Sequence, residues 1–199
     1  MSKGYQILLG ILLLSAVLLS GCARDGMDQP AENDPVTEAA SVPSLEDEPS
    51  TEEETSAVQL TFEGTDMEGN PVSSDILSQS KLTMINVWAT FCGPCLSEMP
   101  ELGELAAEYD AEEFQIIGII SDVLEGEDQS LAESLIQQTG ADYTHLLLNE
   151  SIYYALLTDV TAVPTTFFID DNGAILATVI GAREKSVWEE KVNGLLEKQ

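Results

Sequence analysis

The stretch that decides the fold is Leu82-Thr83-Met84-Ile85-Asn86-Val87-Trp88-Ala89, followed after Thr90-Phe91 by Cys92-Gly93-Pro94-Cys95. The first eight residues are mostly apolar, which predicts a buried strand, and the pattern from Leu96 to Tyr109 predicts a helix. The cysteines therefore lie at a strand-to-helix turn. There, unpaired backbone N–H groups and the helix dipole favour negative charge on the first sulfur, as a nucleophilic cysteine requires. This spacing indicates a dithiol redox site.

The two sulfurs are expected to play different parts. Cys92, at the exposed start of the helix, should attack a substrate disulfide and form a mixed disulfide, which Cys95, one turn inward, should then resolve. Gly93 leaves room for the approaching partner, and Pro94 fixes the geometry of the first helical turn. No cofactor is expected beyond the redox-active disulfide Cys92–Cys95.

Two other uses of the cysteine pair are less favoured. A structural disulfide would gain nothing from a turn that exposes its first sulfur. Structural zinc takes four ligands, and one cysteine pair with the single His145 leaves that set short. No metal site is therefore expected, and His145 is assigned to a strand end or the surface with no catalytic role.

The N-terminus has the pattern of an export signal. A cation precedes the apolar run Ile7–Leu19, which is short for a membrane span of about 20 residues. Its end, Leu19-Ser20-Gly21-Cys22, resembles the lipobox of bacterial lipoproteins. Residues 1–21 are then a lipoprotein signal peptide and Cys22 carries the lipid anchor, which is durable because it holds two or more acyl chains. The alternative is an uncleaved membrane helix, Gly4–Gly21.

Residues 22–57 are expected to form a disordered acidic tether. They are rich in Asp, Glu and Pro and have almost no large apolar side chains, so they cannot bury enough surface to offset the entropy of ordering. A flexible coil of roughly 35 residues has a reach of about 30 to 35 Å. Residues 58–199 then form one domain of ordinary size, held close to the membrane.

The chain is strongly acidic, with a net charge of −29, and no Lys or Arg occurs from Leu82 through Ala182. Phosphate binding depends on clustered cations. Neither nucleic acid nor anionic lipid is therefore expected to bind the domain itself, and its partners should be basic, neutral or apolar.

The remaining pattern predicts an α/β fold with a central mixed sheet flanked by helices. Further strands are expected at 58–62, 114–120, 145–148, 165–169 and 174–180, and further helices at 74–78, 128–139, 151–157 and 184–197. The strand–helix–strand order around the cysteines implies a parallel crossover. Turn residues at Gly69-Asn70-Pro71 and at Asp170-Asp171-Asn172-Gly173 predict an N-terminal hairpin and a second hairpin near the C-terminus.

Three landmarks carry a family resemblance: Trp88 through Cys95, then Glu98-Met99-Pro100, then Val163-Pro164-Thr165 before a strand. In this order they resemble thioredoxin-like proteins of the membrane-tethered TlpA and ResA type, which include redoxin domains. The resemblance covers roughly Val58 to Gln199. It implies a thioredoxin fold with an N-terminal β-hairpin extension and a protein disulfide oxidoreductase.

The resemblance also implies an acid/base for the second cysteine. In thioredoxin a buried Asp on the preceding strand assists proton transfer, but the matching position here is Asn86, which cannot titrate. Glu98 matches a glutamate that TlpA and ResA type proteins keep after their cysteine pair, so Glu98 is the candidate acid/base for Cys95. The alternative is a solvated carboxylate favoured by the helix dipole.

Four further residues are assigned to substrate binding by the same resemblance. Pro164 matches the cis-proline of the family, beside which the backbone of Val163 pairs with an extended substrate. Trp88 and Phe91 match aromatics that pack the cysteine turn and form an apolar rim, with Phe91 the favoured substrate contact. Arg183 follows the loop that borders this groove and is either near its mouth or a surface residue at a helix start.

The leading hypothesis is therefore an extracytoplasmic reductase, anchored to the bacterial cell membrane by the lipid on Cys22 and acting as a monomer. Its substrates would be disulfides of exported proteins, such as apocytochrome c or a repair reductase, and an integral membrane electron donor would recharge it. Alternatives are a thiol peroxidase, whose Pro-x-x-x-Thr-x-x-Cys pattern is absent around Cys92, and a non-catalytic lipoprotein that binds or senses redox state. A copper chaperone of the Sco kind would need a CxxxC pair.

Overall fold

The computed structural model describes residues 59–199. The expected signal peptide, the Cys22 anchor and the tether lie outside these residues. Within the described part, no helix combines the length and the apolar character needed to cross a membrane.

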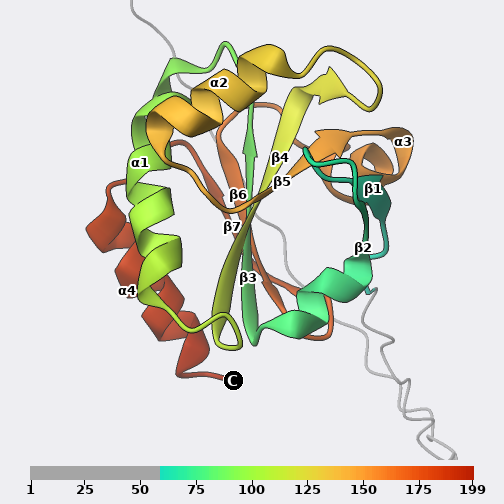
Figure 1. The fold of residues 1–199 in the computed structure, drawn as a ribbon. Coiled ribbons are helices and arrows are strands. Elements are labelled where there is room, and N and C mark those ends of the chain that lie inside the picture. Colours follow the sequence, from blue (N-terminus) through green and yellow to red (C-terminus); the bar gives the residue numbers. More distant parts are fainter. Residues whose placement is uncertain (1–58) are drawn as a thin grey trace, which may run out of the picture. The chain divides into compact units, whose positions relative to one another are not determined.

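A five-stranded sheet with strand order β5-β4-β3-β6-β7 forms the centre of the domain (Figure 1). Its strands are β3 Leu82–Trp88, β4 Phe114–Leu124, β5 Thr144–Leu148, β6 Thr165–Asp170 and β7 Ile175–Ile180. β3, β4 and β5 are parallel, whereas β6 pairs antiparallel with both β3 and β7. The expected α/β class, mixed sheet and parallel crossover are confirmed.

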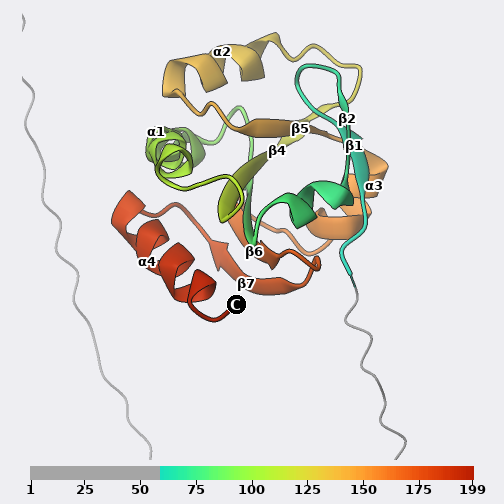
Figure 2. The same cartoon turned by 60° about the horizontal axis from the view of Figure 1, so that its bottom comes forward.

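Helices cover both faces of this sheet (Figure 2). On one face lie α1 Gly93–Glu108, α2 Ser130–Thr139 and α4 Lys185–Leu196, and on the other the 3-10 helix η1 Ser74–Gln79, α3 Glu150–Ile152 and the π-helix η2 Tyr153–Leu157. Every residue of β3 is buried, because this central strand is covered on both faces. Asn86 and Trp88 therefore share the face beneath α1, since side chains alternate along a strand.

The expected N-terminal hairpin is present, but it starts later than the sequence indicates. It consists of β1 Glu63–Thr65 and β2 Pro71–Ser73. Residues 59–62 belong to no strand. The side chain of Phe62 instead packs in the core against η1 and α3, so this apolar segment contributes burial and not ladder hydrogen bonds.

Two other elements depart from the local pattern. β4 continues four residues beyond the expected end at Ile120, through a bulge that re-pairs Leu124 with Leu148. The helix expected at 151–157 is one α-helical turn followed by a π-helix, whose buried leucines join the core below the sheet. Tertiary packing overrides local propensity at both places.

Candidate active site

The cysteine pair forms a disulfide at the start of α1. Cys92 is the N-cap residue, and its Sγ accepts the backbone N–H of Cys95 at 3.2 Å. Pro94 lies in the first turn, where its missing N–H costs nothing. Cys92 retains 6% of its surface and Cys95 none, so both are buried in the disulfide and Cys92 is the more accessible of the two.

Hydrogen bonds from β4 hold the loop that carries Cys92. The backbone N–H of Thr90 donates to both carboxylate oxygens of Asp122, at 3.0 and 3.1 Å. The hydroxyl of Ser121 donates to the carbonyl of Trp88 at 2.9 Å. The loop is therefore fixed to the neighbouring strand before the helix begins.

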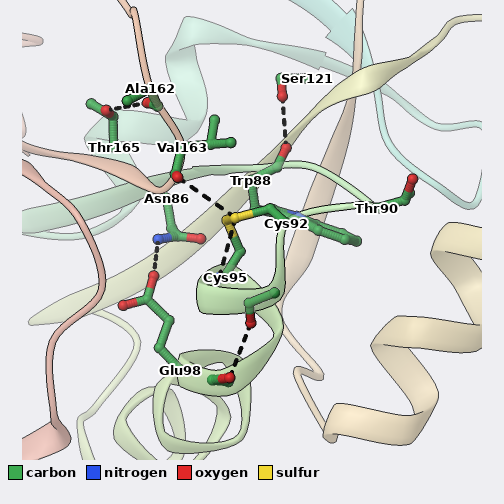
Figure 3. Close-up of a disulfide and its surroundings, with 12 residues drawn as sticks. Asn86, Trp88, Thr90, Cys92, Cys95, Glu98, Ser121, Ala162, Val163 and Thr165 are labelled. Carbon is green, nitrogen blue, oxygen red and sulfur yellow. Dashed lines mark hydrogen bonds between the residues drawn. A yellow bond between two sulfur atoms is a disulfide. The ribbon is translucent and has the colours of Figure 1, made fainter. Parts of the chain in front are cut away.

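The loop before β6 faces the same sulfur. The Val163–Pro164 peptide bond is cis, as the family resemblance implies. The carbonyl oxygen of Val163 lies 3.6 Å from Cys92 Sγ (Figure 3). Gly181 donates its N–H to the Pro164 carbonyl at 2.8 Å, so the end of β7 supports the proline loop.

Glu98, one turn after Cys95 in α1, is buried, with 3% of its surface exposed. Its Oε1 accepts from Asn86 Nδ2 at 3.0 Å, and its Oε2 accepts the backbone N–H of Arg183 at 3.1 Å. Burial raises the pKa of the Glu98 carboxyl, and the two hydrogen bonds oppose this shift without cancelling it. A carboxyl with a raised pKa holds a proton more readily than an exposed carboxyl does, which suits an acid/base group.

A small pocket of about 260 Å³ borders Glu98 on the solvent side. Its walls come from the first turns of α1 and from the loop between β7 and α4, and include Ser97, Glu101, Ala182 and Arg183. The Arg183 guanidinium donates to the carbonyls of residues 180–182, so this side chain stabilises the loop.

The two aromatic residues around the cysteine turn have opposite environments. Phe91 is 78% exposed, whereas Trp88 is fully buried. The Trp88 indole N–H donates to His145 Nδ1 at 3.2 Å. His145 lies at the start of β5, as the strand-end alternative expects, and it is buried and not on the surface. Burial lowers the pKa of His145 to about 4, so its ring is neutral at pH 7.

Sequence analysis missed the polar partners of Glu98. The sequence shows that Asn86 cannot titrate, but it does not predict the hydrogen bond from Asn86 to Glu98. It also does not predict that Thr166 Oγ1 accepts a second hydrogen bond from Asn86 Nδ2, at 3.1 Å. A polar residue inside an otherwise apolar strand was the available signal. Among residues 59–199, no group of three or more candidate metal ligands occurs.

Comparison with known proteins places this geometry in a family. Residues 38–196 match the Redoxin family. The chain is 31% identical over 140 residues to the thiol:disulfide interchange protein DsbE of Escherichia coli strain K12, covering 70% of this chain and 71% of that protein. It is 28% identical over 137 residues to the thiol-disulfide oxidoreductase ResA of Bacillus thuringiensis strain Al Hakam, covering 69% and 73%.

A solved structure supports the same assignment. The thioredoxin-family thiol:disulfide interchange protein of Chlorobium tepidum TLS is 25% identical, with a TM-score of 0.60 over 69% of this chain and 94% of that chain. This likeness confirms the thioredoxin fold. The chain therefore belongs to the Redoxin family and is a thioredoxin-like thiol:disulfide oxidoreductase.

Proposed function

We propose that this protein reduces disulfides of exported proteins, with Cys92 as nucleophile, Cys95 as resolving thiol and Glu98 as the base for Cys95. The single observation that carries the proposal is the asymmetry of the pair. One sulfur caps a helix beside a cis-proline loop, and the other is fully buried next to a carboxyl whose pKa burial raises.

The first step uses the helix start. The N–H of Cys95 and the N-terminal end of α1 stabilise negative charge on the Cys92 sulfur. The thiolate attacks one sulfur of the substrate disulfide. That S–S bond breaks, a mixed disulfide forms, and the second substrate sulfur leaves as a thiolate, which water protonates.

The second step uses the buried side. Cys95 gives its proton to the Glu98 carboxylate and attacks the Cys92 sulfur. The mixed S–S bond breaks with its electron pair on the substrate sulfur, and the enzyme disulfide is restored. Two electrons have then passed from the dithiol to the substrate, and Glu98 returns its proton to water through the adjacent pocket.

The substrate lies across the cis-proline loop in this proposal. The backbone of Val163, beside Pro164, pairs with an extended segment, and Phe91, with 78% of its surface exposed, supplies an apolar contact. Trp88 is fully buried, so its part is to pack the turn. Main-chain pairing tolerates varied side chains, which suits an enzyme with several protein substrates.

The cellular setting is also part of the proposal. Residues 1–21 would be removed, the lipid on Cys22 would anchor the protein outside the cytoplasm, and residues 22–57 would serve as the tether. An integral membrane protein would return the two electrons to the disulfide. Apocytochrome c and a repair reductase are the candidate substrates.

Turnover of insulin disulfides with an external dithiol tests the activity. Wild-type protein should accelerate insulin reduction, and Cys92→Ser should abolish the acceleration. Consumption of hydroperoxide in place of insulin would indicate a peroxidase, and neither activity would indicate a binding or sensing protein.

Trapping in cells tests the direction and the partners. In Cys95→Ala the mixed disulfide on Cys92 cannot be resolved, so exported substrates should remain covalently attached and can be identified by mass spectrometry. The matched control, Cys92→Ala, should trap none. Equal trapping by the two variants would contradict the assigned order of the sulfurs.

A further inference from the structure

Asn86 carries an unpaired oxygen beside the disulfide. Its Nδ2 donates to Glu98 Oε1 at 3.0 Å and to Thr166 Oγ1 at 3.1 Å, which uses both N–H hydrogens. Its Oδ1 is buried and has no hydrogen-bond partner among residues 59–199. Such an oxygen is costly in a protein interior, and its presence calls for a reason.

The neighbours of Asn86 dictate which way its amide faces. Both carboxyl oxygens of Glu98 accept hydrogen bonds, Oε1 from Asn86 Nδ2 and Oε2 from the Arg183 N–H, so the NH2 group of Asn86 faces Glu98. Asn86 has no exposed surface, and its oxygen cannot turn to solvent. The oxygen is therefore held on the opposite side of the amide.

That opposite side is where the sulfurs lie. Figure 3 shows the Asn86 nitrogen on the side of Glu98 and the oxygen on the side of the cysteine pair. Helical spacing agrees, because Glu98 follows Cys95 by three residues and shares its face of α1. The side chain that is hydrogen-bonded to Glu98 therefore lies at the face of α1 that carries Cys95.

We propose that Asn86 Oδ1 accepts the thiol hydrogen of Cys95 when the disulfide is reduced, which makes Asn86 a positioning residue. The inference rests on the proposed function of the pair. In the disulfide neither sulfur carries a hydrogen. Reduction adds a hydrogen to the Cys95 sulfur. The resulting S–H can donate a hydrogen bond to Asn86 Oδ1, which has no other donor among the described residues.

This hydrogen bond has two consequences. It holds the Cys95 S–H in one orientation, next to the Asn86–Glu98 hydrogen bond, before Glu98 removes the proton. It also exists in the dithiol and not in the disulfide, so it stabilises the reduced form. Asn86 thereby makes the pair a weaker reductant than the same pair without the amide oxygen.

A redox equilibrium with glutathione tests the second consequence. Full-length Cys22→Ser protein, with Cys92 and Cys95 as its thiols, is compared with the same protein carrying Asn86→Leu, at about pH 6, where free thiols are protonated. Loss of one net hydrogen bond should favour the disulfide about fivefold. Thr166→Val, which leaves Oδ1 and the contact with Glu98 in place, should change the equilibrium less than about twofold. An unchanged or opposite shift in Asn86→Leu overturns the proposal.

Infrared spectroscopy gives a readout that does not depend on the Asn86 variant. In full-length Cys22→Ser, Cys92→Ala protein, Cys95 is the single thiol. Its S–H stretch should lie below that of a free thiol, and Asn86→Leu should restore the free position. A free-thiol band with Asn86 in place overturns the proposal even if the Leu variant fails to fold.

The two proposals fail separately. Insulin reduction by the wild type together with a free-thiol S–H band would keep the reductase and reject the part assigned to Asn86. A hydrogen-bonded band without insulin reduction would reject the reductase and keep the contact.

Discussion

One row of side chains crosses the sheet beneath α1, and its two halves are built differently. Thr166, Asn86, Gly118 and His145 pair in this order across β6, β3, β4 and β5, so they point to the same face. In one half, His145 Nδ1 accepts from Trp88 and Nε2 donates to the Ala141 carbonyl at 3.0 Å. In the other half, the Asn86 oxygen has no hydrogen-bond partner in the part of the chain that the structure describes.

This difference teaches how to separate a structural polar group from a reactive one. His145 and Glu98 are equally inaccessible, each with 3% of its surface exposed, so burial does not distinguish them. The hydrogen bonds do. Both ring nitrogens of His145 are hydrogen-bonded and the ring is neutral. Glu98, by contrast, is a buried carboxyl, and the oxygen of its neighbour Asn86 accepts no hydrogen bond from the described residues.

The largest effect is expected on the structural half. Gly118 leaves room for the His145 ring, and a Cβ at this position would overlap the imidazole. Gly118→Ala should therefore lower the free energy of unfolding by about 3 kcal/mol, measured by urea denaturation. Gly194→Ala, where a Cβ meets nothing within 4 Å, is the control and should not destabilise. If Gly118→Ala is as stable as wild type, the row is not tightly packed.

The next effect is expected on the reactive half. Glu98→Gln removes the base for Cys95, so resolution of the mixed disulfide at pH 7 should slow about 100-fold, measured by stopped-flow with a fluorescent substrate. In the wild type the rate should fall as pH decreases through the raised pKa of Glu98, and the variant should lose this dependence. Glu104→Gln, an exposed position on the same helix, should leave the rate unchanged. A wild-type rate in Glu98→Gln would make Glu98 a structural residue.

A gradual effect, spread over several pH units, is expected from protonation of His145. Burial lowers its pKa from 6.5 to about 4, so the unfolded chain takes up a proton at a higher pH than the folded protein. The stability from neutral His145 is complete above pH 6.5 and is lost as the pH falls toward 4, at up to about 1.4 kcal/mol per pH unit. His145→Gln, neutral at every pH, should show a flatter dependence of unfolding free energy on pH. Parallel curves for the two proteins would contradict the assignment.

The smallest effect on stability is expected outside the row, at the exposed Phe91. Phe91→Ser should change the free energy of unfolding by less than about 0.5 kcal/mol. It should raise KM for a protein disulfide about fivefold, because about 1 kcal/mol of apolar contact is lost, and leave turnover of a small disulfide unchanged. Tyr154→Ser, equally exposed at 73% but on η2, is the control. Equal KM values for wild type and Phe91→Ser would remove Phe91 from the substrate contact.

Much of the architecture was predictable because its signals are local. The apolar run of β3, the Gly140 stop of α2, which has φ 67°, and the turn before Gly173, with φ 81°, each depend on a few neighbouring residues. The 3-10 and π-helical elements and the extension of β4 beyond Ile120 through a bulge were not predictable in the same way. Packing against residues far along the chain determines their shape.

The residues of the candidate site also differ in whether a local signal could identify them. Cys92, Pro94 and Cys95 were recognisable from spacing alone, and Glu98 and Pro164 from the family resemblance. The strand-end position expected for His145 was right, but its burial could not be predicted, because the partners that bury a polar residue come from other parts of the chain. Gly118 and Trp88, which accommodate it, come from two other strands.

The amino-acid order was enough to establish the dithiol turn, its place at a helix start and the class of redox chemistry, because these depend on contacts within one turn of chain. Folding alone decided what surrounds the second sulfur. Asn86 and Arg183 are 12 and 85 residues from Glu98 in sequence, yet both donate to its carboxylate. The packing of α1 against β3 and the loop after β7 brings them together, and the burial of the carboxyl there raises the pKa of Glu98 although these hydrogen bonds lower it. A local sequence pattern cannot predict contacts between residues so far apart in the chain.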